Sequence, residues 1–144
     1  MSAYIRSLSR LLSHDSTPKL GLNRMSRVLE VMGNPQNNFL SFHVAGTNGK
    51  GSTCAFLSAL LGHAFDKVGL YTSPHLLCTR ERIQINNNLI DESLFYEAEN
   101  IVFDAAHTIG EKLTFFERMT AMAYWIFSKQ LVKVAVIEVG LGGR

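Results

Sequence analysis

The chain has 144 residues, of which 47% are apolar and 18% are charged, so its composition is typical of one globular domain and excludes a disordered chain. Fourteen Lys and Arg against twelve Asp and Glu leave a net charge of +2, which provides neither a broad basic face for nucleic acid nor an acidic tail. Cys54 and Cys78 lack Cys or His neighbours at metal-ligand spacing, and no apolar run approaches the roughly 20 residues of a membrane span, so we expect reduced thiols and a soluble chain.

The first 38 residues predict a helical lead-in. Apolar residues over Tyr4–Leu12 recur at helical spacing, which predicts a short amphipathic helix. An acid-free start rich in Arg and Ser is also typical of an organelle transit peptide, but the segment is short, so we favour a helix that packs on the domain. After a loop over Asp15–Leu22, a second helix is predicted over Asn23–Met32, with Asn23 as its cap and Gly33-Asn34-Pro35 as its stop.

Residues 39–144 predict an α/β portion. The apolar run Phe39–Ala45 indicates a buried strand, a helix over Lys50–Ala64 follows, and Lys67–Tyr71 indicates a second strand. These three elements form a βαβ unit, which favours a parallel sheet. The later elements are a strand over Arg82–Ile85, a turn at Asn86–Asn88, a helix capped by Asp91 and ending near Ile109, a helix capped by Thr114 and ending near Gln130, and a buried strand over Val132–Val139.

The predicted last strand leads into Gly140–Arg144. Parallel sheets are covered on both faces, and no helix follows this strand. We therefore expect an incomplete domain, the N-terminal part of a longer protein.

The most specific motif lies between the first strand and its helix, in Gly46-Thr47-Asn48-Gly49-Lys50-Gly51-Ser52-Thr53. Glycines let the backbone wrap closely around phosphate oxygens, the helix N-terminus supplies N–H groups, and Lys50 reaches the β- and γ-phosphates. A strict Walker A motif would have Gly at Val44 and a hydroxyl at Gly51, so this loop departs from it. We predict that these residues bind a nucleotide, rather than forming only a tight turn.

Two oxygen-bearing side chains are candidates for a metal site. Glu138 ends the apolar strand residues Val134–Ile137, where an unpaired carboxylate would lose hydration and a metal ion would offset that cost. An acid at an already solvated strand end is the alternative. Ser73 follows the second strand, and its hydroxyl is an acceptable Mg²⁺ ligand, although loop serines usually bond to backbone.

The run Gly46–Lys50 resembles the ATP loop of the Mur ligase superfamily, and Gly51-Ser52 after it is similar to the folylpolyglutamate synthase/dihydrofolate synthase branch. Gly69–Leu76, Thr114–Glu117 and Ile137–Arg144 also resemble that branch. The resemblance implies a Mur ligase-like ATPase domain with a P-loop, and a C-terminal domain that these residues lack. It further implies a ligase that uses ATP and Mg²⁺ to add L-glutamate to 7,8-dihydropteroate or to folylpolyglutamate through an acyl phosphate.

The resemblance also implies roles for particular residues. Lys50 and Glu138 would be catalytic, and Ser73 and Glu138 would bind Mg²⁺. His75 stays open between lining the site and being an ordinary loop residue. The residues implied to contact the pteroate substrate are Leu20, Gly21, Leu22, Thr114, Phe115, Phe116 and Glu117, although Thr-x-x-Glu is also a helix capping box.

Other residues are assigned to structure. For Arg82 and Arg118, contact with phosphate or carboxylate is one alternative, but we favour a place on the surface, solvated or ion-paired. We expect Cys54 to be a small buried residue rather than a nucleophile. The residues expected in the core at helical spacing are Met119, Met122, Trp125 and Ile126.

Two other functions remain open at this stage. One is a peptidoglycan-type Mur ligase, against which Gly51 argues, and the other is a non-catalytic nucleotide-binding fragment. We expect a cytoplasmic monomer whose partners are ATP, L-glutamate and dihydropteroate or folate, with no nucleic acid or membrane, and no ligase turnover by the 144 residues alone.

Overall fold

The computed structural model describes residues 3–13 and 21–140, and the chain divides into two compact units. The sheet unit combines Asn37–Ile90 with Phe127–Arg144. The helical unit combines Met1–Gln36 with Asp91–Ile126. Leu20 and Leu141–Arg144, which carry several of the predictions above, lie outside the described residues.

The sheet has five strands in the order β1-β5-β2-β3-β4. β5 (Val134–Glu138) lies between β1 (Leu40–Val44) and β2 (Val68–Tyr71) and is parallel to both, which confirms the predicted parallel α/β core. The rest of the sheet is antiparallel: β3 (Ile83–Ile85) pairs with β2, and β4 (Asn88–Leu89) pairs with β3.

The antiparallel part corrects the expectation of a parallel sheet. Asn86 and Asn87 have φ values of 52° and 60°, which is the conformation of a two-residue hairpin turn that favours Asn. Such a turn joins only antiparallel strands, because parallel strands need a longer crossover. The turn was therefore predicted correctly, but the short strand β4 that follows it was not.

β1 is an edge strand among the described residues and not the buried strand that its apolar sequence predicts. Leu40 and Phe42 are 69% and 46% exposed, whereas β2 and β5 are buried along their whole length. Only β5 pairs with β1 in the described part of the chain, so the side chains of β1 have strand neighbours on one side alone. The prediction for Phe39–Ala45 was right about the strand and wrong about its burial.

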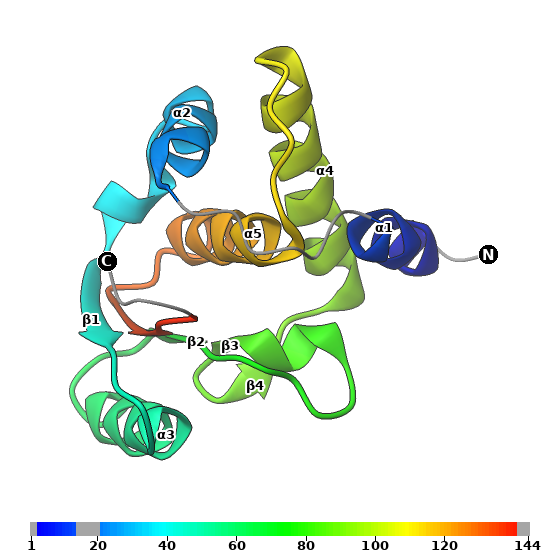
Figure 1. Ribbon diagram of the computed structural model, residues 1–144. Helices are drawn as coiled ribbons and strands as arrows, with labels where there is room; N and C mark the ends of the chain where they lie inside the picture. Colours follow the sequence, from blue (N-terminus) through cyan, green and yellow to red (C-terminus); the bar gives the residue numbers. More distant parts are fainter. Residues whose placement is uncertain (1–2, 14–20, 141–144) are drawn as a thin grey trace. The chain divides into compact units, whose positions relative to one another are not determined.

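α3 (Lys50–Leu61) lies against the sheet (Figure 1) and ends before the predicted Ala64. Cys54 of this helix is fully buried in a cluster with Leu70 of β2 and Val136 of β5. Cys54 is thus the small buried residue that was predicted.

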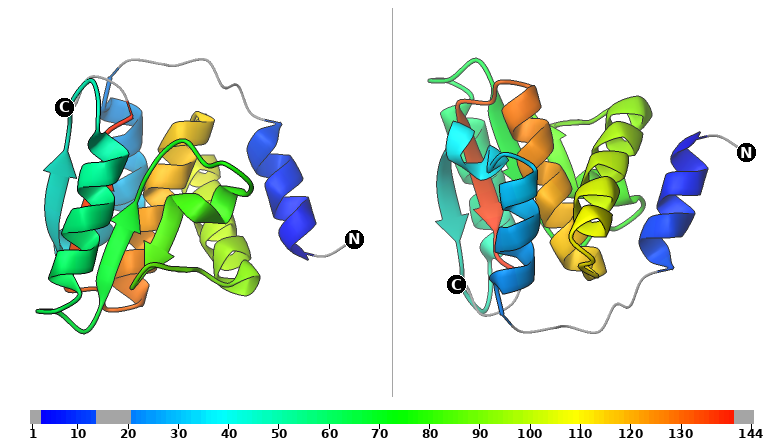
Figure 2. Two further views of the ribbon diagram at one scale, coloured as in Figure 1. Left: turned by 90° about the horizontal axis from the view of Figure 1, so that it is seen from below. Right: turned by 90° about the horizontal axis from the view of Figure 1, so that it is seen from above.

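Helices make up the other unit. α1 (Ala3–Leu12) lies alongside α4 (Glu92–Thr108) (Figure 2), where the rings of Tyr4 and Phe95 meet edge-on with centroids 5.4 Å apart. The predicted core of α5 is confirmed, since Met119, Met122 and Ile126 are fully buried and Trp125 is partly buried. The helices of this region are α1 (Ala3–Leu12), α2 (Asn23–Val31), α4 (Glu92–Thr108) and α5 (Phe115–Lys129).

One of the predicted helix caps differs from the observed one. Asn23 is the first residue of α2 rather than its cap, and Asp91 stands at the N-cap of α4 without a side-chain hydrogen bond to the helix. Two short 3-10 helices, Pro35–Asn38 and Thr79–Arg82, were not predicted. In the described part of the chain, no helix combines the length and apolar character that crossing a membrane requires.

Candidate functional site

The glycine loop connects β1 to α3. Gly49 is the N-cap of α3 and has a φ of 73°, which a residue with a Cβ adopts only with strain. The Lys50 ammonium donates a hydrogen bond to the carbonyl of Gly46 at 3.0 Å, and the Thr53 hydroxyl donates one to the carbonyl of Gly49 at 2.9 Å. The loop is therefore closed on itself beside the free N–H groups of the first turn of α3, which is an arrangement suited to an anion.

The strand register brings the loops that follow β1, β2 and β5 to the same end of the parallel strands. Val44, which precedes the glycine loop, pairs with Glu138 of β5, and Tyr71, which precedes Thr72 and Ser73, pairs with Ile137. The carboxyl ends of these parallel strands therefore coincide, and ligands of open α/β sheets bind outside such ends.

Ser73 and Glu138, predicted as partners in metal binding, are in direct contact. The backbone N–H of Ser73 donates a hydrogen bond to Oε2 of Glu138 at 2.8 Å. Glu138 is only 5% exposed, and no Lys, Arg or His of the described residues forms a salt bridge with it. Burying a carboxylate without a cation beside it costs free energy, and binding of a cation would offset that cost.

The donor set suits Mg²⁺ better than a metal that needs many protein ligands. The described residues contain no group of three or more His, Cys, Asp or Glu side chains placed to hold a metal. Mg²⁺ prefers oxygen ligands and usually keeps several waters, so that one or two protein oxygens together with phosphate oxygens complete its shell. The Glu138 carboxylate and the Ser73 hydroxyl fit that pattern.

Cys54 lies within electrostatic range of this site but is not a nucleophile. Burial raises the pKa of its thiol to about 11, the Glu138 charge adds to the rise, and Lys50 opposes it. The thiol is therefore protonated at neutral pH, and the thiolate is the reactive form.

His75 and Arg82 are bonded to each other after β2. Nε of Arg82 donates to Nδ1 of His75 at 2.9 Å. Burial lowers the pKa of His75 and the Arg82 charge lowers it further, against an opposing contribution from Glu81. Arg82 is only 9% exposed, so its predicted place on the surface was wrong.

The two predicted substrate segments are joined within the helical unit. Glu117 accepts hydrogen bonds from the backbone N–H and the hydroxyl of Thr114, at 2.8 and 2.9 Å, so the predicted capping box is present. The same carboxylate forms an ion pair with Arg24 at 2.9 Å, and Arg24 follows Gly21 and Leu22 closely in the chain. Phe116 is 37% exposed beside this pair and Leu22 is 59% exposed.

The predictions missed a buried charge network in the helical unit. Arg10 and Arg118 both pair with Glu99, which is fully buried, and Arg118 is only 3% exposed. Burial lowers the pKa of Arg118, and Glu99 opposes that effect. Arg118 is therefore ion-paired as one alternative predicted, but it lies in the interior and not on the surface.

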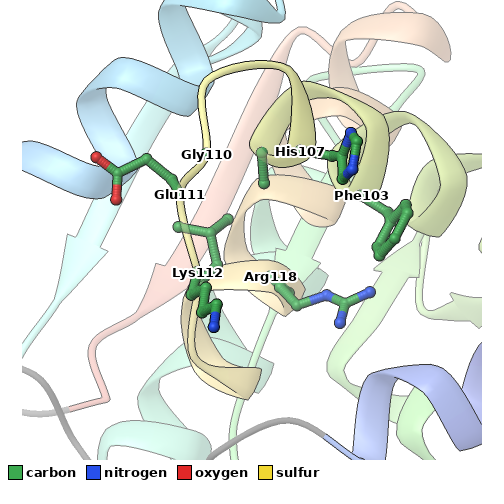
Figure 3. Close-up of a pocket in the computed structure, with 8 residues that line it drawn as sticks. Phe103, His107, Gly110, Glu111, Lys112 and Arg118 are labelled. Atoms are coloured by element: carbon green, nitrogen blue, oxygen red, sulfur yellow. The ribbon is translucent and has the colours of Figure 1, made fainter.

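Arg118 also contributes to a cavity of about 300 Å³ within the helical unit (Figure 3). None of the predicted site residues lines this cavity. Its lining consists of Phe103, Ala106, His107, Gly110, Glu111, Lys112, Leu113 and Arg118.

Comparisons with known proteins identify relatives over most of the chain. No family model matches the sequence. It is 44% identical over 126 residues to a Schizosaccharomyces pombe protein named "Probable dihydrofolate synthetase", a match that spans 88% of this chain and 30% of that protein. It is 41% identical over 131 residues to the Escherichia coli dihydrofolate synthase/folylpolyglutamate synthase, spanning 91% of this chain and 31% of that one.

A solved structure agrees with these relatives. The structure of Escherichia coli FolC in complex with DHPP and ADP superposes with a TM-score of 0.89 at 37% identity, over 99% of this chain and 34% of that one. The chain thus spans about a third of the length of the proteins it matches, at identities well above those of a shared fold alone. The 144 residues belong to the folylpolyglutamate synthase/dihydrofolate synthase family of the Mur ligase superfamily.

Proposed function

We propose that this chain supplies the ATP- and Mg²⁺-binding part of a ligase that joins L-glutamate to 7,8-dihydropteroate, to folylpolyglutamate, or to both. One observation carries the proposal: the glycine loop, Ser73 and Glu138 all lie at the carboxyl ends of the neighbouring parallel strands β1, β2 and β5. The names of the relatives support the same activity, and the peptidoglycan-type alternative has no support among them.

The glycine loop would bind the nucleotide phosphates. The proposed phosphate-binding residues are those of Gly46–Thr53, whose backbone N–H groups begin α3. The Lys50 ammonium donates a hydrogen bond to the Gly46 carbonyl in this structure. On nucleotide binding it would donate to a phosphate oxygen instead, because a hydrogen bond between two charged groups is stronger. The ADP of the Escherichia coli structure supports this assignment.

Glu138 and Ser73 would hold the Mg²⁺ that accompanies ATP. The ion supplies charge neutralisation on the phosphoryl oxygens. Oε2 of Glu138 accepts the N–H of Ser73, which keeps the hydroxyl-bearing residue beside the carboxylate.

The proposed reaction activates a carboxylate, which is a poor electrophile. A carboxylate oxygen of the pteroate or folate substrate attacks the γ-phosphorus of ATP, and ADP leaves. The amine of L-glutamate then attacks the acyl carbon, phosphate leaves, and the nitrogen loses a proton to form the amide. Lys50 screens charge in the first step, and Gly21, Leu22 and the segment Thr114–Glu117 would contact the pteroate substrate, with Leu20 beside them in the chain.

Binding of ATP to the 144-residue chain tests the proposal. Isothermal titration with ATP and excess Mg²⁺ should detect binding that Lys50→Ala weakens by about 10- to 100-fold, since a charged hydrogen bond contributes about 1.5–3 kcal/mol. Lys133→Ala is the matched control, because Lys133 is an exposed lysine of the same unit just before β5 and should leave binding unchanged. Equal binding by Lys50→Ala and wild type would refute a phosphate-binding role for the loop.

The finer proposals concern the protein's partners. We infer that L-glutamate is the amine substrate and that the protein acts as a cytoplasmic monomer. Size-exclusion chromatography at several concentrations checks the oligomeric state, and a second species that grows with concentration would contradict it.

A further inference from the structure

The segment Thr72–Arg82 connects β2 to β3 and carries Ser73 near its start. Glu81, near its end, accepts hydrogen bonds from three successive backbone N–H groups. Oε2 accepts from Leu76 at 2.7 Å, and Oε1 accepts from Leu77 at 2.8 Å and from Cys78 at 2.7 Å. A capping box satisfies one such amide with its acidic side chain, so Glu81 does more than cap the 3-10 helix in which it lies.

Arg82 fixes the other half of the same segment. Its carbonyl accepts the N–H of Thr72 at 3.1 Å, and its Nε donates to His75. Ser73 therefore lies between two residues tied to Arg82, and its own N–H is tied to Glu138.

Burial of side chains does not explain the backbone conformation at Leu76 and Leu77. Leu76 and Leu77, at the positions that Glu81 holds, are 89% and 94% exposed. These two apolar side chains thus face solvent, while their backbone N–H groups donate hydrogen bonds to the Glu81 carboxylate. These amides also lower the pKa of Glu81, led by that of Leu76, which keeps the carboxylate ionised and accepting.

We propose that Glu81 is a positioning residue: by gathering the amides of Leu76, Leu77 and Cys78, it holds the segment that places the Ser73 hydroxyl beside Glu138 for Mg²⁺. The inference rests on the proposed function, since it assigns Glu81 to the same metal site. It acts through Ser73 and touches neither metal nor nucleotide.

Glu81→Gln is the direct test. The side chain keeps its size but retains one carbonyl oxygen for three donors, and its amide nitrogen turns towards N–H groups. At a fixed, low ATP concentration, the Mg²⁺ concentration for half-maximal ATP binding should rise by about tenfold, as is usual when a group that orients a metal ligand is removed. Saturating Mg²⁺ should restore binding, which a general loss of structure would not allow.

Two controls keep the test specific. Glu30→Gln removes an exposed carboxylate from α2 and should leave the Mg²⁺ dependence unchanged. Amide hydrogen exchange should accelerate at Leu76, Leu77 and Cys78 in Glu81→Gln, while β2 stays protected. If Glu81→Gln unfolds, Glu81→Asp, which keeps the charge on a shorter side chain, is used instead. It should raise the Mg²⁺ concentration for half-maximal ATP binding in the same direction, but by less.

The outcomes separate this inference from the proposed function. Wild-type chain that binds no ATP at any Mg²⁺ concentration would overturn both. Wild-type binding with an unchanged Mg²⁺ dependence in Glu81→Gln would overturn only the role of Glu81, as would a loss of binding that saturating Mg²⁺ does not restore.

Discussion

Replacing Gly69 with alanine should destabilise the chain, because β2 has no room for a side chain at this position. A Cβ on Gly69 would lie 2.9 Å from Cδ1 and from Cε1 of Phe127 and 3.0 Å from its Cζ. Phe127 is fully buried and its ring packs edge-on against Phe39, with centroids 5.7 Å apart, so the ring has little freedom to turn away. Either the ring or strand β2 must shift.

The expected loss is about 1–3 kcal/mol in the free energy of unfolding, the usual cost of overpacking a filled core. The added contacts would be roughly 0.6 Å shorter than the closest favourable separation of two carbon atoms. With a dependence on urea of about 2 kcal/mol per M, the unfolding midpoint should fall by roughly 0.5–1.5 M. Far-ultraviolet circular dichroism during a urea titration measures this midpoint.

Gly51→Ala is the matched control. It adds the same atoms, but no atom lies within 4 Å of the new Cβ and the residue is in α3. Alanine there should raise stability by about 0.5–1 kcal/mol through the helix preference. A Gly69→Ala midpoint at or above that of wild type would refute the steric argument, and so would strictly additive losses when Gly69→Ala is combined with Phe127→Leu.

Two further predictions concern buried ionisable groups. Iodoacetamide at pH 8 should alkylate Cys78 but not Cys54 in the folded chain, because burial raises the pKa of Cys54 to about 11, and equal labelling by mass spectrometry would contradict this. That pKa lies above the unfolded value of 9.0, so the stabilising contribution of the neutral thiol should be complete below pH 9 and decline as pH rises from 9 to 11. Urea titrations at each pH measure this decline, and Cys54→Ala should reduce it. Glu99→Gln should cost about 3–5 kcal/mol, because it leaves the buried Arg118 without its carboxylate. Adding Arg118→Met should recover part of that loss, and a midpoint unchanged by Glu99→Gln would show that the network contributes nothing.

Periodicity along the chain was enough to predict most helices and strands. The spacing of apolar residues in α4 and α5 and the glycine-rich stop after β1 are local signals, and local signals decide where an element begins. The burial of β1 was misjudged because an apolar run indicates that the side chains favour burial, but not that strands pair on both sides of it. The antiparallel pairing of β4 with β3 depended on the φ angles of Asn86 and Asn87, where the sequence indicated the turn but not the short strand that follows it.

The site divides in the same way. The glycine loop is contiguous and could be predicted, whereas Ser73 and Glu138 are 65 positions apart and meet only because β2 and β5 are neighbours. Glu99 offered an overlooked signal, since it falls between Phe95 and Val102 on the buried face of α4, where an acid needs a partner. The three bonds of Glu81 leave no sequence signature, because the backbone amides that it gathers belong to every residue type.

The open edge of β1 has a practical consequence for work on the isolated chain. In the described residues, one row of its backbone N–H and C=O groups faces away from the sheet, and Leu40 and Phe42 stand exposed beside that row. Such an edge is a template on which another extended chain can add as a further strand. We expect aggregation of the purified chain to begin at this strand, which directly precedes the glycine loop. Aggregated samples would then bind less nucleotide for a reason unrelated to the chemistry of Lys50. A charged residue in place of Leu40, outside every proposed ligand contact, is therefore a sensible background for all of the binding measurements.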